Sequence, residues 1–215
     1  MTDEPIQTIS GIENRGAERF LLMMRPAKVV MPQGEFLCIL KDVSATGVRL
    51  RLFHPLPPGQ RMMLELSNGD RFEAEKVWER EDQAGLRFVE EADVQMLLGE
   101  RARYPKRQIR VRLELPAKLT VAGEAHSATL HDLSQQGGRI ESPVPLAIDQ
   151  RVHLEVPGLP PIDAKVRWRR TPEAGLIFEQ TFKLDELARI LVRLQRGGQR
   201  GTADVRAVAS GLRRA

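Results

Sequence analysis

The feature that most constrains the fold of this chain is an internal repeat with a period of 90 residues. The spacing Asp-x-Ser-x-x-Gly occurs at residues 42–47 and again at residues 132–137. When the same offset is applied without gaps, Trp78 falls on Trp168, so the only two tryptophans of the chain occupy equivalent positions. Because unusual residues coincide along the chain and not only at one turn, the repeat indicates one domain built twice.

Each copy contains short apolar segments that alternate with polar residues and are separated by turn residues. Asn68-Gly69-Asp70 is the strongest hairpin signal among these turns. No helical pattern separates the segments, which argues against a parallel sheet and favours a small antiparallel barrel or sandwich. In the first copy, strands are predicted over Phe20–Val30, Glu35–Leu40, Gly47–Phe53, Arg61–Leu66, Arg71–Glu79 and Gly85–Val89.

Two amphipathic helices are predicted, one after each copy. Val94, Leu97 and Leu98 recur at helical spacing within residues 90–101, and leucines form one stripe within residues 184–196. The predicted organisation is a flexible N-terminal lead (1–12), a first domain with a linker helix (13–101), a second domain with a C-terminal helix (102–196) and a flexible basic tail (197–215).

Composition argues against several functional classes. Cys38 is the only cysteine, so neither an internal disulfide nor a cysteine-based zinc cluster is expected, and a reducing compartment fits best. No run of about 18 apolar residues occurs, and the four histidines belong to no metal-binding or catalytic motif. The sequence therefore predicts a cytoplasmic protein with no membrane span, no metal and no enzymatic activity.

The positive charge of the chain is modest in total but uneven in placement. The net charge is +4 with a pI near 9.6, and arginines gather at residues 101–112 and 189–214. Basic patches of this kind suit an anionic ligand, a nucleic acid or a membrane surface, so charge alone does not choose among them.

The order of these signals resembles the PilZ family, small bacterial barrels that bind the second messenger cyclic di-GMP. The family pattern is Arg-x-x-x-Arg before the first strand, Asp-x-Ser-x-x-Gly after it, then a tryptophan strand and Gly-x-x-Phe. In the first copy these positions are Arg15, Arg19, Asp42, Ser44, Gly47, Trp78, Gly85 and Phe88. The resemblance implies an all-β fold with short helices, made of two tandem small antiparallel β-barrels of PilZ type, each followed by an α-helix.

The second copy has the same corner but an ambiguous arginine segment. Its corner residues are Asp132, Ser134, Gly137 and Gly138. The pair Arg103 and Arg107 ends 25 residues before the aspartate, whereas the first pair ends 23 residues before its own. An alternative pair, Lys106 and Arg110, ends 22 residues before it. Which two of these four side chains would contact a ligand stays open in the sequence.

Arginine suits the ligand that the resemblance implies. Cyclic di-GMP carries two phosphates and two guanines, and the guanidinium offers parallel N–H donors that match phosphate oxygens and the O6 and N7 edge of guanine. By resemblance, the corner aspartate and serine would hydrogen-bond the ligand or steady the arginines. The corner glycine would supply either a positive φ or a close backbone approach.

The predicted function is that of a cyclic di-GMP receptor whose ligand changes contacts between the domains or with a partner. The resemblance implies control of motility, of exopolysaccharide synthesis and biofilm, or of transcription, through a protein partner or DNA, and does not exclude an oligomer. The alternatives are a nucleic-acid-binding small-barrel regulator and a PilZ adaptor without ligand. The four large aromatic residues Trp78, Trp168, Phe88 and Phe178 are predicted to fill barrel interiors.

Overall fold

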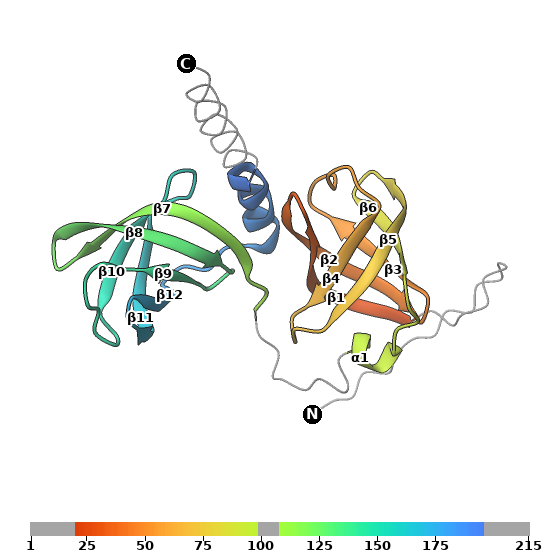
Figure 1. Cartoon of the computed structure of the whole chain (residues 1–215), viewed down its shortest axis with the longest axis horizontal. Coiled ribbons are helices and arrows are strands. Elements are labelled where there is room, and N and C mark those ends of the chain that lie inside the picture. The colour runs from red at the N-terminus through yellow and green to blue at the C-terminus, as the bar shows by residue number, and fades with distance from the viewer. Residues whose placement is uncertain (1–19, 99–107, 196–215) are drawn as a thin grey trace, which may run out of the picture. The chain divides into compact units, whose positions relative to one another are not determined.

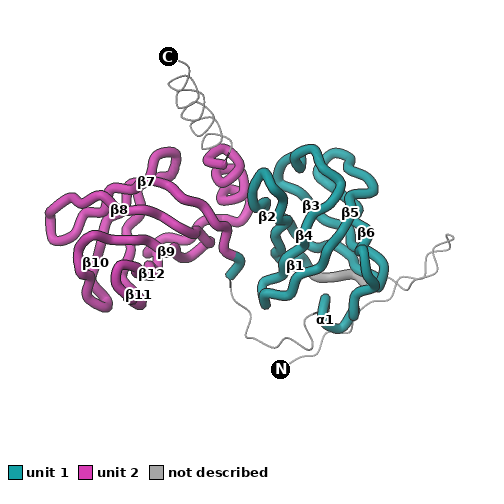
Figure 2. The backbone as a smooth tube through the Cα atoms, in the orientation of Figure 1, with its two compact units in different colours: residues 1–109 teal, residues 110–215 magenta. Residues whose placement is uncertain are grey.

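The computed structural model describes residues 20–98 and 108–195, with side chains from residue 24 onward. The chain divides into two compact units, residues 1–109 and residues 110–215 (Figure 1 and Figure 2). Each unit is built around one closed antiparallel barrel of six strands. The predicted fold class is confirmed, and of the two architectures that the strand pattern allowed, the barrel is correct.

The first barrel has the strand order β1-β2-β3-β6-β5-β4. Its strands are β1 (Phe20–Met31), β2 (Gly34–Ser44), β3 (Gly47–Leu52), β4 (Arg61–Leu66), β5 (Arg71–Arg80) and β6 (Gln83–Phe88). The helix α1 (Val94–Leu98) follows and begins later than predicted, because Asp93 caps it by accepting a hydrogen bond from the backbone N–H of Gln95 at 2.9 Å. The last three residues of the predicted linker helix, 99–101, lie outside the described residues.

The second barrel repeats this order in β7 (Val111–Val121), β8 (Glu124–Leu133), β9 (Gly137–Glu141), β10 (Arg151–Glu155), β11 (Ile162–Arg170) and β12 (Glu173–Phe178). A helix over residues 184–195 follows, as predicted. Leu187 and Leu191 of its apolar stripe are almost fully buried. In the part of the chain that the structure describes, no helix is both long and apolar enough to span a membrane.

The two cores are built from equivalent residues. In a regular strand, residues on one face alternate with those on the other, as in β3, where every second residue is buried. Three leucines of the first barrel have no exposed surface, and neither do their counterparts 90 residues later: Leu40, Leu50 and Leu64, then Leu130, Ile140 and Leu154. The repeat seen in the sequence is therefore a repeat of the packed interior.

The aromatic residues divide between the interior and the surface. Phe88 and Phe178 are each 5% exposed, which confirms their predicted core position. The prediction is wrong for the tryptophans, because Trp168 is 37% exposed and Trp78 is half-buried. A register shift between Val166 and Trp168 inserts one extra residue into β11, and this irregularity turns the indole onto the outer face of the barrel.

Candidate functional site

The corner of each copy contains a β-bulge that decides which side chains meet. In the second barrel Leu130 pairs with Ile140, but the next pair is Asp132 with Arg139, so His131 is an extra residue in β8. Without a bulge, residues 130 and 132 would point to the same face. The bulge instead keeps Leu130 in the core and places the aspartate directly opposite an arginine. His131 makes a 3.3 Å contact from Nε2 to Oε2 of Glu141.

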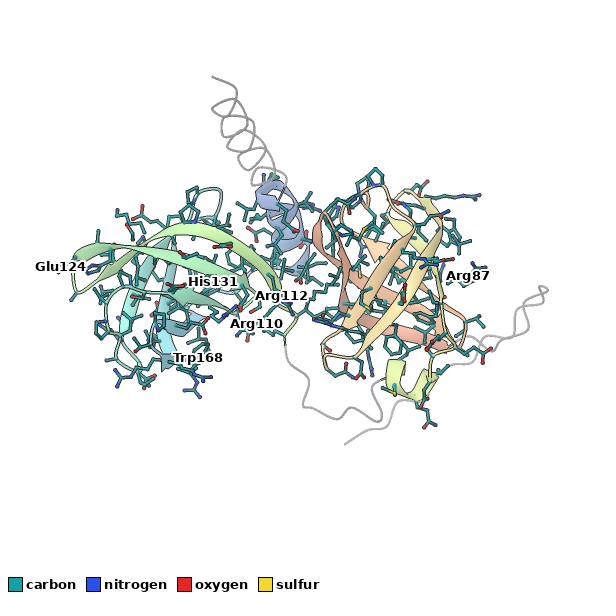
Figure 3. The ribbon with its side chains drawn as sticks, in the orientation of Figure 1. Arg87, Arg110, Arg112, Glu124, His131 and Trp168 are labelled. Atoms are coloured by element: carbon teal, nitrogen blue, oxygen red, sulfur yellow. The ribbon has the colours of Figure 1, made fainter. Side chains whose placement is uncertain are left out.

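Asp132 is the centre of the site in the second barrel. Its side chain is 12% exposed, Oδ1 accepts a hydrogen bond from Nη1 of Arg110 at 2.6 Å, and Oδ2 accepts one from Nε of Arg139 at 3.0 Å. Arg139 also donates from Nη1 to Oε1 of Glu173. The hydrogen bond to Asp132, helped by the charge of Glu173, raises the pKa of Arg139 above its ordinary value. Two guanidinium groups are therefore held in fixed positions, that of Arg139 on β9 and that of Arg110 directly before β7 (Arg110 is labelled in Figure 3).

The first barrel has a simpler version of this arrangement. Asp42 pairs across the corresponding bulge with Arg49, which contacts Oδ2 through both Nε (2.6 Å) and Nη2 (2.5 Å). The counterpart of Glu173 is Gln83, which carries no charge. Within the described ranges, the two copies thus share one carboxylate–arginine pair, and the second copy adds a second arginine and a second carboxylate to it.

The corner serines close the turn. Oγ of Ser134 donates to the carbonyl oxygen of Gly137 at 3.0 Å, and the backbone N–H of Ser134 donates to the same oxygen at 2.8 Å. Ser44 makes the equivalent contact to Gly47, at 3.3 Å. Among the described residues, the serine hydroxyls therefore steady the corner backbone.

The corner glycines are needed because a neighbouring strand lies too close for a side chain. A Cβ at Gly137 would lie 2.3 Å from the carbonyl oxygen of Leu176, and one at Gly47 would lie 2.5 Å from that of Leu86. Neither glycine has φ in the left-handed region. Of the two explanations that the sequence left open, close approach is the correct one. Gly138 is also crowded, since a Cβ there would lie 2.8 Å from the carbonyl oxygen of Asp132.

The site continues across the sheet as a row of paired residues. Asp132 pairs with Arg139, Arg139 with Gly175, and Gly175 with Trp168, so one residue from each of β8, β9, β12 and β11 lies in line. The first barrel has the same row in the same order, Asp42, Arg49, Gly85 and Trp78. We call this line of four residues the corner row.

Each tryptophan covers the glycine of its row. A Cβ at Gly175 would lie 1.9 Å from Nε1 of Trp168, with Cε2 at 2.3 Å and Cδ1 at 2.5 Å. Because these neighbouring ring atoms are only slightly farther away than Nε1, the ring lies face-on over the glycine. The same contacts occur between Gly85 and Trp78. Glycine is thus required for the indole to lie flat on the outer surface of the barrel.

The arginine segments are only partly described. Arg15, Arg19, Arg103, Lys106 and Arg107 lie outside the described residues. Of the predicted arginines, Arg110 is the one that the structure places, and it contacts Asp132.

The strand register nevertheless relates the two segments. Phe20 pairs with Val43 in the first barrel, and Val111 pairs with Leu133 in the second. The offset between the copies is therefore 91 residues at this point, because the bulge of β1 holds one residue more than the bulge of β7. Since Arg19 precedes Phe20 as Arg110 precedes Val111, this register equates the first arginine pair with Lys106 and Arg110.

Sequence reasoning missed Arg139, Arg49 and Glu173. The signal for the two arginines was present, because each follows the corner glycine by two residues in both copies. Nothing in the sequence pointed to Glu173, whose counterpart is a glutamine. Within the described ranges, no group of three or more His, Cys, Asp or Glu residues is arranged to hold a metal ion.

Comparison with known proteins gives one family and several related structures. The family model described as "PilZ domain" matches residues 13–104 and residues 100–196. No curated protein matches the chain. Similar solved structures include PlzA of Borreliella burgdorferi in complex with c-di-GMP, which is 11% identical, covers 78% of this chain and 86% of its own, and has a TM-score of 0.32.

Two further similar structures have comparable values. YcgR of Escherichia coli in complex with c-di-GMP is 15% identical over 85% of this chain and 88% of its own, with a TM-score of 0.31. The inhibitor of motility MotI/DgrA of Bacillus subtilis is 13% identical over 83% of this chain and 99% of its own, with a TM-score of 0.35.

Proposed function

The chain belongs to the PilZ domain family, and on that premise we propose that it is a receptor for cyclic di-GMP, with a binding site at the corner row of each barrel. The observation that carries the proposal is the nearly buried carboxylate of Asp132, which orients two arginines, Arg110 and Arg139. Because a carboxylate holds them, these guanidinium groups lose little side-chain freedom when an anionic ligand binds.

The chemistry of the site fits the ligand. Arg110 and Arg139 both lie against Asp132, and a guanidinium can bind a phosphate or the O6 and N7 edge of guanine through two parallel bonds. The proposed contacts are made by Arg15, Arg19, Asp42, Ser44 and Gly47 in the first copy. In the second copy they are made by Lys106, Arg110, Asp132, Ser134, Gly137 and Gly138, with Arg103 and Arg107 as the other pair.

We expect the second copy to bind more tightly than the first. Its corner carries two oriented arginines, whereas the first corner carries Arg49 alone among the described residues. The arginine pair of the first copy, Arg15 and Arg19, must be ordered by the ligand if the predicted N-terminal lead is flexible. That ordering costs about 1–2 kcal/mol per residue.

The proposed output is a change in the geometry between the two domains. Residues 103–110 connect the predicted linker helix to β7, so a ligand that orders this segment also restrains the linker. Regulation of motility, exopolysaccharide synthesis or transcription would then follow through a protein partner or DNA. Small-angle scattering with and without saturating cyclic di-GMP tests this part, and identical profiles would refute the coupling.

Titration calorimetry with cyclic di-GMP tests the receptor itself. We expect saturable binding to the wild-type chain, strongly weakened at the second site by the double variant Lys106→Ala with Arg110→Ala. Arg151→Ala, an exposed arginine on β10, serves as the control and should leave binding unchanged. Absence of binding to the wild type would refute the proposal. If Arg103→Ala with Arg107→Ala abolishes binding while the first variant is silent, the register inferred from the strands is wrong.

The same assay ranks the two copies. The double variant Arg15→Ala with Arg19→Ala should leave the tighter site intact and remove the weaker one. If this variant removes the tighter site instead, the ranking is reversed, and the argument from oriented arginines fails with it.

A further inference from the structure

The outer face of β11 has a charge pattern that its counterpart in the first barrel lacks. Strand β11 carries four basic residues and one acidic residue, whereas residues 72–80 of the first barrel carry two basic and three acidic residues. Lys165 replaces Glu75, and Arg169 replaces Glu79. Glu79 and Arg169 each hydrogen-bond the backbone of the equivalent loop residue, Leu56 and Leu146, whereas no such shared contact accounts for Lys165 in place of Glu75.

The basic residues of β11 are not neutralised. Among the described residues, no ion pair involves Lys165, Arg167 or Arg170. Arg167 and Arg170 are exposed, and Lys165 is half-buried. In the first barrel, by contrast, Glu75 pairs with Arg61 and Arg87 and Glu79 pairs with Lys76. Uncompensated positive charge therefore distinguishes the β11 face, and it attracts an anionic partner.

An exposed aromatic ring lies in the middle of these charges. Trp168 stands between Arg167 and Arg169 on β11, at the outside of the second barrel (Figure 3). Its ring is fixed face-on over Gly175, and yet the residue retains 37% of its surface exposed. A fixed aromatic surface with cations on both sides offers a stacking platform for a base and donors for the phosphates beside it.

We propose that the β11 face, formed by Lys165, Arg167, Trp168 and Arg170, binds single-stranded nucleic acid. The cations by themselves do not identify the partner, because they would pair equally well with nucleic-acid phosphates and with the carboxylates of an acidic protein. The exposed indole favours a partner with accessible base faces, which a duplex hides within its stack. At about 3.3 Å per residue, the strand from Lys165 to Arg170 extends over roughly 16 Å, enough to follow a short stretch of extended backbone.

The internal repeat supplies exact controls for a binding experiment. Arg170 and Arg80 occupy equivalent positions at the ends of β11 and β5, both are exposed, and neither forms an ion pair within the described residues. Trp168 and Trp78 are likewise equivalent and cover equivalent glycines. Each variant of the second barrel can thus be compared with the same change of charge or volume in the first.

The experiment is a titration of the full chain into fluorescein-labelled dT20, followed by fluorescence anisotropy at several salt concentrations. We expect wild-type affinity to fall with salt, as phosphate contacts require, and Arg170→Glu to weaken binding roughly tenfold with a shallower salt dependence. Arg80→Glu should stay within about twofold of the wild type. Trp168→Leu should weaken binding by a similar factor at an unchanged salt slope, whereas Trp78→Leu should not.

Three results would overturn the inference: equal losses in Arg170→Glu and Arg80→Glu, tighter binding of a 20-base-pair duplex than of dT20, or equally effective competition by polyglutamate. Because Trp168→Leu can disturb folding, its circular dichroism spectrum is compared with that of the wild type, while Arg170→Glu changes an exposed side chain and keeps the test decisive. Calorimetry with cyclic di-GMP on Arg170→Glu separates this inference from the receptor proposal, because Arg170 is not part of the corner row: cyclic di-GMP binding should be unchanged in this variant while dT20 binding falls.

Discussion

Replacement of the corner aspartate by asparagine should affect the two barrels differently. Asparagine keeps the shape of the side chain but has one oxygen in place of two. Among the described residues only Arg49 contacts the carboxylate of Asp42, and it does so through Oδ2 alone, so at position 42 one oxygen is enough for the described contacts. At position 132 both oxygens are used, Oδ1 by Arg110 and Oδ2 by Arg139, so in Asp132→Asn one guanidinium must face an NH₂ group.

The magnitude follows from the number of bonds lost. A hydrogen bond that involves a charged group contributes about 1.5–3 kcal/mol. The guanidinium stays charged in both variants, so a bond that asparagine can still accept is weakened and not lost, whereas at position 132 one bond is lost outright. The side chains of Arg110 and Arg139 are 45% and 34% exposed, and water replaces part of the loss. We expect Asp132→Asn to destabilise the second barrel by about 2 kcal/mol and Asp42→Asn to destabilise the first by less than about 1 kcal/mol.

Hydrogen exchange measured by mass spectrometry reads the two barrels separately. Peptides from β8 and β9 report on Asp132→Asn, and peptides from β2 and β3 report on Asp42→Asn. Faster exchange should be larger in the second barrel and confined to it. Equal losses of protection in the two variants, or a larger loss in Asp42→Asn, would show that the second arginine contributes nothing to the folded corner.

Three further predictions concern other parts of the structure. Gly137→Ala and Gly47→Ala should each cost about 1–3 kcal/mol in urea denaturation, because the new methyl group meets the carbonyl oxygen of Leu176 or Leu86, and losses below about 0.5 kcal/mol would contradict the close approach. Burial raises the pKa of the Cys38 thiol, so above about pH 9 the unfolded chain loses this proton while the folded chain keeps it. The free energy of unfolding should therefore fall by up to about 1.4 kcal/mol per pH unit more in the wild type than in Cys38→Ala. If the free energy of unfolding of both proteins depends on pH in the same way, titration of the Cys38 thiol is excluded as the cause. The hydrogen bond from Arg87 lowers the pKa of Glu75, so the stabilisation by this ion pair is present at neutral pH and is lost as pH falls through that lowered pKa. The difference in free energy of unfolding between wild type and Glu75→Gln should therefore shrink on acidification. A difference that stays constant with pH would count against the ion pair.

Much of the architecture could be predicted because it depends on local patterns that recur. The 90-residue repeat, the alternation of apolar residues and the Asn68-Gly69-Asp70 turn are readable in the sequence, and the structure has a hairpin at that turn with φ of 91° at Gly69. The repeat also predicts that the two cores are equivalent, as Leu40 and Leu130 confirm. These features need only the period of two of a strand and the chemistry of turns.

The candidate site was only partly predictable, because its composition depends on where the strands are irregular. One extra residue at His131 reverses the face on which the following side chains point, and this places Asp132 opposite Arg139. An extra residue at Arg167 does the same for Trp168, which is why a residue predicted to be in the core lies on the surface. Hydrophobic periodicity carries no marker for either insertion.

The sequence by itself determined two repeated antiparallel β domains, their order and the residue types at each corner, since strand pattern and turn chemistry are properties of neighbouring residues. Only the tertiary structure decided that Arg139 and Glu173 complete the corner of the second barrel and that the offset between the copies is 91 rather than 90 before the first bulge. The physical reason is that cross-strand contacts depend on register, and a single bulged residue changes the register for every residue beyond it.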